Sequence, residues 1–156
     1  LGGVYKLSAT RAPGQTEWTD RLKISESAAK LTVPGVLDVR RYYHDDGHIA
    51  GDMVLDVNAG VGEREVIVDP LDSLRQKNLS GKRFETLLSP LARNGEVVLD
   101  QAHRSAMEAQ RRCREGLASL DESQKRMLNP HTYPVGLEYG LCERRRALVG
   151  KLRGIA

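Results

Sequence analysis

Three lysines in the first 30 residues are the side chains whose type and spacing best suit a ligand. Lys6 and Lys23 each lie between two apolar residues, so they could share one face of a sheet, and Lys30 follows soon after. A cluster of ammonium groups would hold a phosphate through charge-assisted hydrogen bonds. Lys6, Lys23 and Lys30 are therefore the candidate substrate- or phosphate-binding residues. The simpler alternative is that all three are ordinary solvent-facing positions.

The other ionisable groups favour structural roles. Asp45-Asp46 is the clearest carboxylate pair, but it precedes Gly47 in a predicted turn, where Asp side chains commonly bond the backbone. His44 and His48 flank the same turn and could face each other across a hairpin. No Cys or third His lies near them in sequence, so no metal site is predicted.

No nucleophile or phosphate loop is recognisable. Cys113 and Cys142 form no CxxC pair, fall on or near apolar helix faces and are expected to be small buried residues in a reducing cytoplasm. None of the common nucleotide-binding, hydrolase or metalloprotease motifs occurs. The glycine-rich stretch 60–62 is expected to be a loop between strands. We therefore predict no catalytic residue in this chain.

The first 100 residues are predicted to be rich in strands. Short alternating runs favour strands at 4–7 and 21–25. Two Gly-containing turns predict hairpins, one between strands 37–43 and 48–57, the other around Asn94-Gly95. A further strand at 65–68 ends at Asp69-Pro70.

After residue 100 the apolar period becomes three to four residues, which is typical of amphipathic helices. The first helical stripe comprises Ala102, Ala106, Ala109, Cys113, Leu117 and Leu120, and the last comprises Leu137, Leu141, Leu148, Leu152 and Ile155. A short helix over 121–128 lies between them. We predict an α+β fold, in which an antiparallel strand-rich segment (1–100) precedes two or three C-terminal helices (101–156). The two segments would form one domain or part-domain together.

The charge distribution supports a rival interpretation. Residues 101–156 carry 11 Lys+Arg against 6 Asp+Glu, which is a surplus of five positive charges. A non-catalytic interaction module with a basic helical tail, binding nucleic acid, would explain it. We consider a solvated helix face the better explanation, because no aromatic residues are interspersed among the arginines. No apolar run approaches the roughly 20 residues that span a membrane.

Several stretches together resemble the nicotinate phosphoribosyltransferase family. They keep the family's order along nearly the whole chain: Leu1-Gly-Gly-Val-Tyr-Lys-Leu7, Lys23-Ile-Ser-Glu26, Lys30-Leu-Thr-Val-Pro-Gly35, Arg41, Leu88-Ser-Pro-Leu-Ala-Arg-Asn-Gly95 and Leu128-Asn-Pro-His-Thr-Tyr-Pro-Val135. One departure is Val36-Leu37, where the family pattern has a Lys after Pro-Gly.

The resemblance implies the C-terminal portion of a larger α/β-barrel enzyme of the cytoplasm. The family makes nicotinate mononucleotide from nicotinate and 5-phosphoribosyl-1-diphosphate, with ATP hydrolysis through a phosphorylated histidine and with magnesium on the phosphates. No residue here matches that histidine, so the fragment alone is expected to be inactive and to bind neither ATP nor Mg itself. The implied partners are small-molecule substrates, the missing N-terminal and barrel part of the polypeptide, and a second subunit of a homodimer. Neither a membrane nor nucleic acid is an expected partner.

Overall fold

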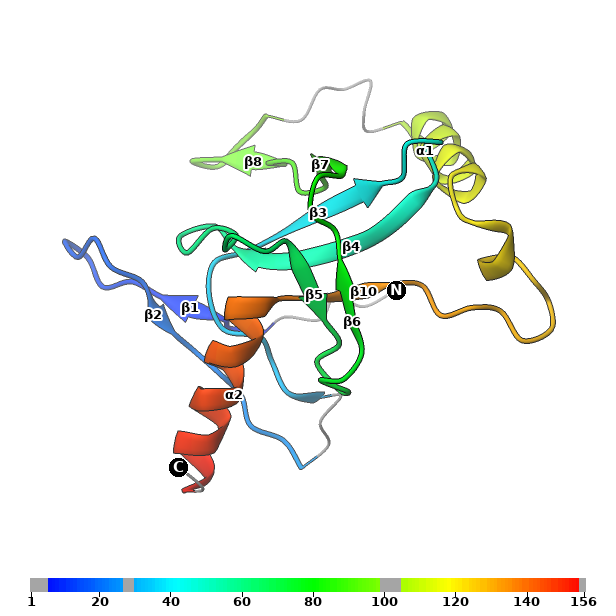
Figure 1. Cartoon of the computed structure of the whole chain (residues 1–156). Helices are drawn as coiled ribbons and strands as arrows, with labels where there is room; N and C mark the ends of the chain where they lie inside the picture. The colour runs from blue at the N-terminus through cyan, green and yellow to red at the C-terminus, as the bar shows by residue number, and fades with distance from the viewer. Residues whose placement is uncertain (1–5, 27–29, 99–104, 155–156) are drawn as a thin grey trace.

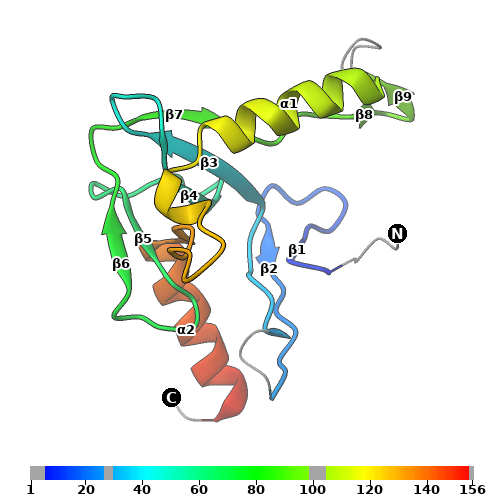
Figure 2. The ribbon, with the colours of Figure 1, turned by 90° about the vertical axis from the view of Figure 1, so that its right-hand side faces the viewer.

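A computed structural model describes residues 6–26, 30–98 and 105–154, and its centre is a six-stranded mixed sheet (Figures 1 and 2). The strand order is β6-β5-β10-β4-β3-β7. In chain order these strands are β3 (Leu37–Tyr43), β4 (Ile49–Asp56), β5 (Val66–Val68), β6 (Gln76–Asn78), β7 (Arg83–Thr86) and β10 (Val135–Glu138). Together with the helices described below, they confirm the predicted α+β fold.

The longest hairpin confirms the prediction from Asp45-Asp46-Gly47. Strands β3 and β4 pair antiparallel from Leu37 opposite Asp56 to Tyr43 opposite Ile49. Gly47 has φ 87°, which a residue with a Cβ rarely adopts, and it lets the chain reverse there. The hairpin supplies much of one apolar core, which comprises Tyr42, Ala50, Met53, Ile67 and Leu79.

Two small two-stranded sheets lie beside the main one. β1 (Ala9–Thr10) pairs with β2 (Thr19–Asp20), and β8 (Ala92–Arg93) pairs with β9 (Glu96–Val97). The second pair turns through Asn94 and Gly95, both at positive φ, so the predicted hairpin there is confirmed.

The last predicted helix is wrong at its beginning, because Leu137 lies in strand β10. This strand runs parallel to β4 and antiparallel to β5, so the sheet is mixed where only antiparallel pairing was predicted. Pro134 favours an extended chain before it. Gly136 permits close packing, since a Cβ there would lie 2.6 Å from the Val68 carbonyl oxygen. The segment predicted to be helical therefore also contributes a central strand.

The strand predicted at 21–25 is also wrong. β2 ends at Asp20, and the chain that follows is held by isolated hydrogen bonds and not by a ladder. Residues 4 and 5 of the other early strand lie outside the described residues, and Lys6 and Leu7 have no regular structure. The boundary expected at residue 100 also falls outside the described residues, as do Ala102 and Ile155.

Two α-helices follow in the described chain, as predicted: α1 (Ala106–Ala118) and α2 (Tyr139–Arg153). The short helix predicted over 121–128 is wrong in extent, because only a single 3-10 turn (Glu122–Gln124) forms there. α2 packs Leu141 and Cys142 against Val68 and Leu137 to form a second core cluster. α1 buries none of its residues. In both views α1 and α2 lie at opposite ends of the molecule (Figures 1 and 2).

Candidate anion-binding site

The structure brings Lys6, Lys23 and Lys30 together on one cleft of about 630 Å³. The predicted cluster is therefore present, but not through a shared strand face. The three lysines line the same cleft because three stretches of chain, 6–8, 21–25 and 30–32, lie side by side. The described residues that line this lysine cleft are Lys6, Leu7, Arg21, Leu22, Lys23, Ile24, Ser25, Lys30 and Thr32.

Backbone hydrogen bonds hold these stretches in place. The pairing of β1 with β2 continues into Arg21, whose N–H donates to the Ser8 carbonyl at 2.8 Å. The Lys23 N–H donates to the Thr32 hydroxyl at 2.8 Å, and the Thr32 N–H donates back to the Lys23 carbonyl at 3.4 Å. Thr32 is buried, and its carbonyl accepts from Arg145 Nε of α2 at 3.1 Å. The floor of the cleft is thus attached to α2.

Positive charge dominates the cleft. Arg21 adds a fourth cation to the three lysines, and no carboxylate is among the lining residues that the structure describes. None of the three ammonium groups bonds to another residue that the structure describes. Leu7 and Ile24 add exposed apolar surface. A group of cations beside apolar side chains suits an organic anion such as a phosphorylated small molecule. Arg21 was not predicted to be a binding residue, because the sequence pattern that suggested an anion site consisted of lysines alone.

An ion-pair network holds the chain next to Arg21. Arg144 of α2 lies 3.2 Å from Asp20, which immediately precedes Arg21, and 2.5 Å from Asp56 of β4. The Asp56 side chain is only 6% exposed. Gly35 lies against this pair, since a Cβ there would be 2.6 Å from Asp56 Oδ2. The Pro-Gly step of the sequence therefore makes room for a buried ion pair.

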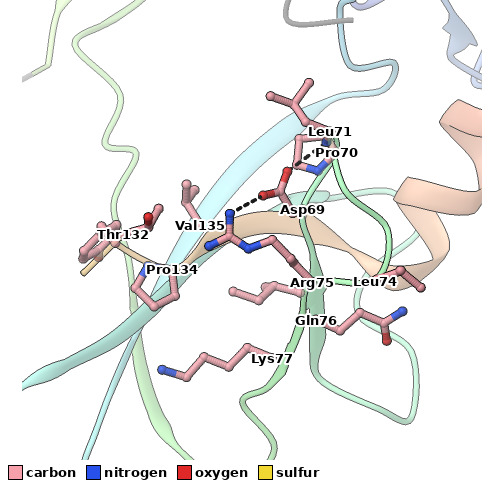
Figure 3. A pocket seen from close by; sticks show the side chains of 12 residues that line it. Asp69, Pro70, Leu71, Leu74, Arg75, Gln76, Lys77, Thr132, Pro134 and Val135 are labelled. Carbon is pink, nitrogen blue, oxygen red and sulfur yellow. Dashed lines mark hydrogen bonds and ion pairs between the residues drawn. The ribbon is translucent and has the colours of Figure 1, made fainter. Parts of the chain in front are cut away.

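A second cleft, of about 540 Å³, lies between the β5–β6 connection and the segment that leads into β10 (Figure 3). Its cations are already engaged. Arg75 pairs with Asp69 at 3.6 Å, and Lys77 Nζ donates to the Ala50 carbonyl at 2.7 Å. Burial, with a smaller contribution from Lys82, lowers the pKa of Lys77. The lysine cleft therefore remains the better candidate for binding an anion.

Asp46, Cys113 and Cys142 line neither of these two clefts. Asp46 accepts a hydrogen bond from the His48 N–H, which holds the pKa of its carboxyl below the usual value, so its turn role is confirmed. Among residues 6–26, 30–98 and 105–154 no group of three His, Cys, Asp or Glu side chains could hold a metal ion. Cys142 is buried as predicted, and burial raises the pKa of its thiol. The prediction for Cys113 is wrong, because it lies exposed on α1.

Arg41, one of the residues behind the family resemblance, is occupied by an internal partner. Its guanidinium donates to both carboxylate oxygens of Asp52, at 2.9 and 2.8 Å. This bond raises the pKa of Arg41 above its ordinary value. Arg41 therefore joins β3 to the buried Asp52 of β4 and is not free to bind a ligand with its full charge.

Several arginines of the basic C-terminal segment bond to carboxylate or carbonyl groups of the same chain. Arg111 bonds Glu108 and Glu115 within α1, and Arg146 pairs with Glu143. Arg144 and Arg145 are engaged with the body of the domain. These internal partners argue against the alternative in which the basic C-terminal segment binds nucleic acid. No helix among the described residues is long and apolar enough to cross a membrane.

Two comparisons with known proteins give a match, one to a family model and one to a solved structure. The family model described as the nicotinate phosphoribosyltransferase C-terminal domain matches residues 38–145. The fold is similar to that of a chain in the crystal structure of human nicotinic acid phosphoribosyltransferase, with a TM-score of 0.60 and 24% sequence identity. The similarity covers 78% of this chain but only 23% of the human chain. No protein with a curated description matches the sequence.

Proposed function

Because the chain belongs to the family of nicotinate phosphoribosyltransferase C-terminal domains, we propose that it is the C-terminal part of an enzyme of NAD biosynthesis. That enzyme would join nicotinate to 5-phosphoribosyl-1-diphosphate and release nicotinate mononucleotide and diphosphate. The family match over residues 38–145 is the observation that carries the proposal. The sugar transfer itself would take place on chain segments outside these 156 residues.

Within this proposal the lysine cleft contributes electrostatics. A transferred ribosyl group and a departing diphosphate carry charges that need preorganised partners. Lys6, Lys23 and Lys30, with Arg21 beside them, would bind a phosphate group of the substrate or product. These residues precede the segment that the family model matches. Their role therefore depends on their own geometry and not on the family.

We further propose ATP coupling through a phosphorylated histidine, with magnesium on the phosphates, in a cytoplasmic homodimer. Neither ATP nor magnesium is assigned to residues of this chain. Within the described part of the chain, the lysine cleft has no carboxylate and no group of metal-binding side chains comes together. The missing N-terminal and barrel part would hold both.

The test is a product assay on the full-length enzyme. Nicotinate and 5-phosphoribosyl-1-diphosphate are incubated with and without ATP and Mg²⁺, and nicotinate mononucleotide is quantified by mass spectrometry. We expect product from nicotinate, less from nicotinamide, and a higher rate with ATP. Absence of nicotinate mononucleotide under every condition would refute the proposed reaction. A rate independent of ATP would refute only the coupling.

A further inference from the structure

Helix α1 is amphipathic, yet its apolar stripe contacts little of this domain. Ala106, Ala109, Cys113 and Leu117 fall on one side of the helix at intervals of three and four residues, and all four are exposed. Glu108, Arg111 and Glu115 lie on the other side, where Arg111 pairs with both glutamates. An apolar stripe opposite a charged face is the pattern of a helix that packs on a neighbour.

The helix has little support of its own. It is 13 residues long and none of its residues is buried. Isolated helices of about 12–15 residues are marginally stable in water. The Ser105 cap and the pairs of Arg111 with Glu108 and Glu115 are exposed and each stabilise the helix only slightly. Further burial of α1 is therefore needed to keep it fully formed.

The C-terminal end of α1 is attached to the body of the domain. The Ser119 carbonyl accepts from the Ile49 N–H at 2.8 Å, and Gly116 and Leu120 border a cleft next to Ile49. From this attachment the helix extends along the periphery, at the end of the molecule opposite α2 (Figures 1 and 2). The exposed stripe therefore extends away from the anchored end of α1. Its outer part is accessible to a second surface that could cover it.

We propose that this stripe docks into an apolar groove on the remaining polypeptide of the same enzyme. The proposal rests on the proposed function, in which this chain is part of a longer protein. The similar human chain has 77% of its length outside the matched region, so the fold occurs there joined to a much larger body. A helix inserted in a groove would bury Ala109, Cys113 and Leu117 together.

Hydrogen–deuterium exchange of the full-length enzyme tests the docking. α2 serves as the internal reference, because Leu141, Cys142 and Arg145 are buried within the domain itself. We expect the amides of α1 to be protected to a degree similar to those of α2. Exchange of α1 at the rate of an unstructured peptide would overturn the proposal.

A matched pair of variants locates the contact on the helix surface. Ala109→Glu places a charge on the stripe, whereas Ala118→Glu places the same charge on another side of α1. We expect Ala109→Glu to speed α1 exchange by about tenfold and Ala118→Glu to leave it near wild type. Equal effects of the two variants would contradict docking through the stripe.

Two further readouts separate the alternatives. If α1 protection falls on dilution as the subunits dissociate, a second copy covers the stripe and the proposal is wrong. Nicotinate mononucleotide formation is measured on the same samples. If the enzyme makes product but its α1 amides are not protected, only the docking proposal is refuted. If the α1 amides are protected but no product forms, only the proposed reaction is refuted.

Discussion

Lys6, Lys23 and Lys30 show which features of a binding site single residues predict and which they do not. Their type and clustering predicted an anion site, and the structure places all three on one cleft. The predicted reason was different, since none of them lies in a regular strand. A pairing of two-residue strands and a Thr32 hydroxyl bring them together, and neither has a pattern that could be recognised in sequence. The ligand itself stays a prediction.

Removing one of these ammonium groups should weaken phosphate binding without altering chemistry. In the full-length enzyme, Lys23→Met is expected to raise the KM for 5-phosphoribosyl-1-diphosphate by about tenfold, because a charged hydrogen bond contributes roughly 1.5–3 kcal/mol. The kcat should change little. Steady-state kinetics would show this. Lys151→Met, on the exposed last turn of α2, is the control and should behave as wild type. A KM unchanged in Lys23→Met would exclude this lysine from the site.

Gly35 should tolerate a methyl group poorly. It has φ 109°, and an added Cβ would lie 2.6 Å from Asp56 Oδ2 and 2.8 Å from an Arg144 nitrogen. Gly35→Ala is expected to lower the free energy of unfolding by about 3 kcal/mol, through backbone strain and crowding together. Gly60→Ala is the control, since Gly60 also has positive φ but open space around it. Gly60→Ala should lower the free energy of unfolding by only about 1–2 kcal/mol. The two variants are compared by urea denaturation. An equal loss of unfolding free energy in both would show that an added Cβ is not crowded at Gly35.

At the scale of elements, the sequence predicted the β3–β4 and β8–β9 hairpins because their turn residues act locally. Asn94 and Gly95 take positive φ, and Gly47 does the same in the longer hairpin. β10 was missed because its four residues are shorter than the helical pattern that they precede. Its place is determined by distant partners, β4 and β5, which local periodicity does not report.

The three consecutive arginines of α2 looked alike in sequence but have different surroundings. Arg144 pairs with Asp20 and the buried Asp56, whereas Arg146 pairs with Glu143 on an exposed surface. Arg144→Met should lower the free energy of unfolding by about 2–3 kcal/mol, because it leaves the Asp56 carboxylate buried without its cation. This is less than for a fully buried pair, since Arg144 is one-third exposed and the Asn58 N–H also bonds Asp56.

Arg146→Met is the matched control for this change. Exposed ion pairs between neighbouring helical turns contribute little, so the loss should be within about 0.5 kcal/mol. Chemical denaturation monitored by the fluorescence of Trp18 would compare the two variants. A larger loss for Arg146→Met than for Arg144→Met would mean that the pairing of α2 with Asp20 and Asp56 is not a source of stability.

At the scale of the whole molecule, the chain combines a mixed sheet, an anchored helix α2 and a helix α1 that lacks burial. The sequence predicted the strand-rich start and the helical end. It could not predict that α1 would stand exposed, because an amphipathic stripe indicates that a helix packs but not on what. The same holds for Cys113, which was expected to be buried and faces outward on α1.

The central claim is that this chain supports a phosphoribosyl transfer that the rest of the enzyme carries out. Its most direct measurement compares nicotinate mononucleotide formation by the full-length enzyme and by residues 1–156 alone, at equal molar concentration with nicotinate, 5-phosphoribosyl-1-diphosphate and ATP. The account predicts turnover by the full-length enzyme and none by the 156-residue chain. Turnover by the isolated chain at the rate of the full-length enzyme would contradict it.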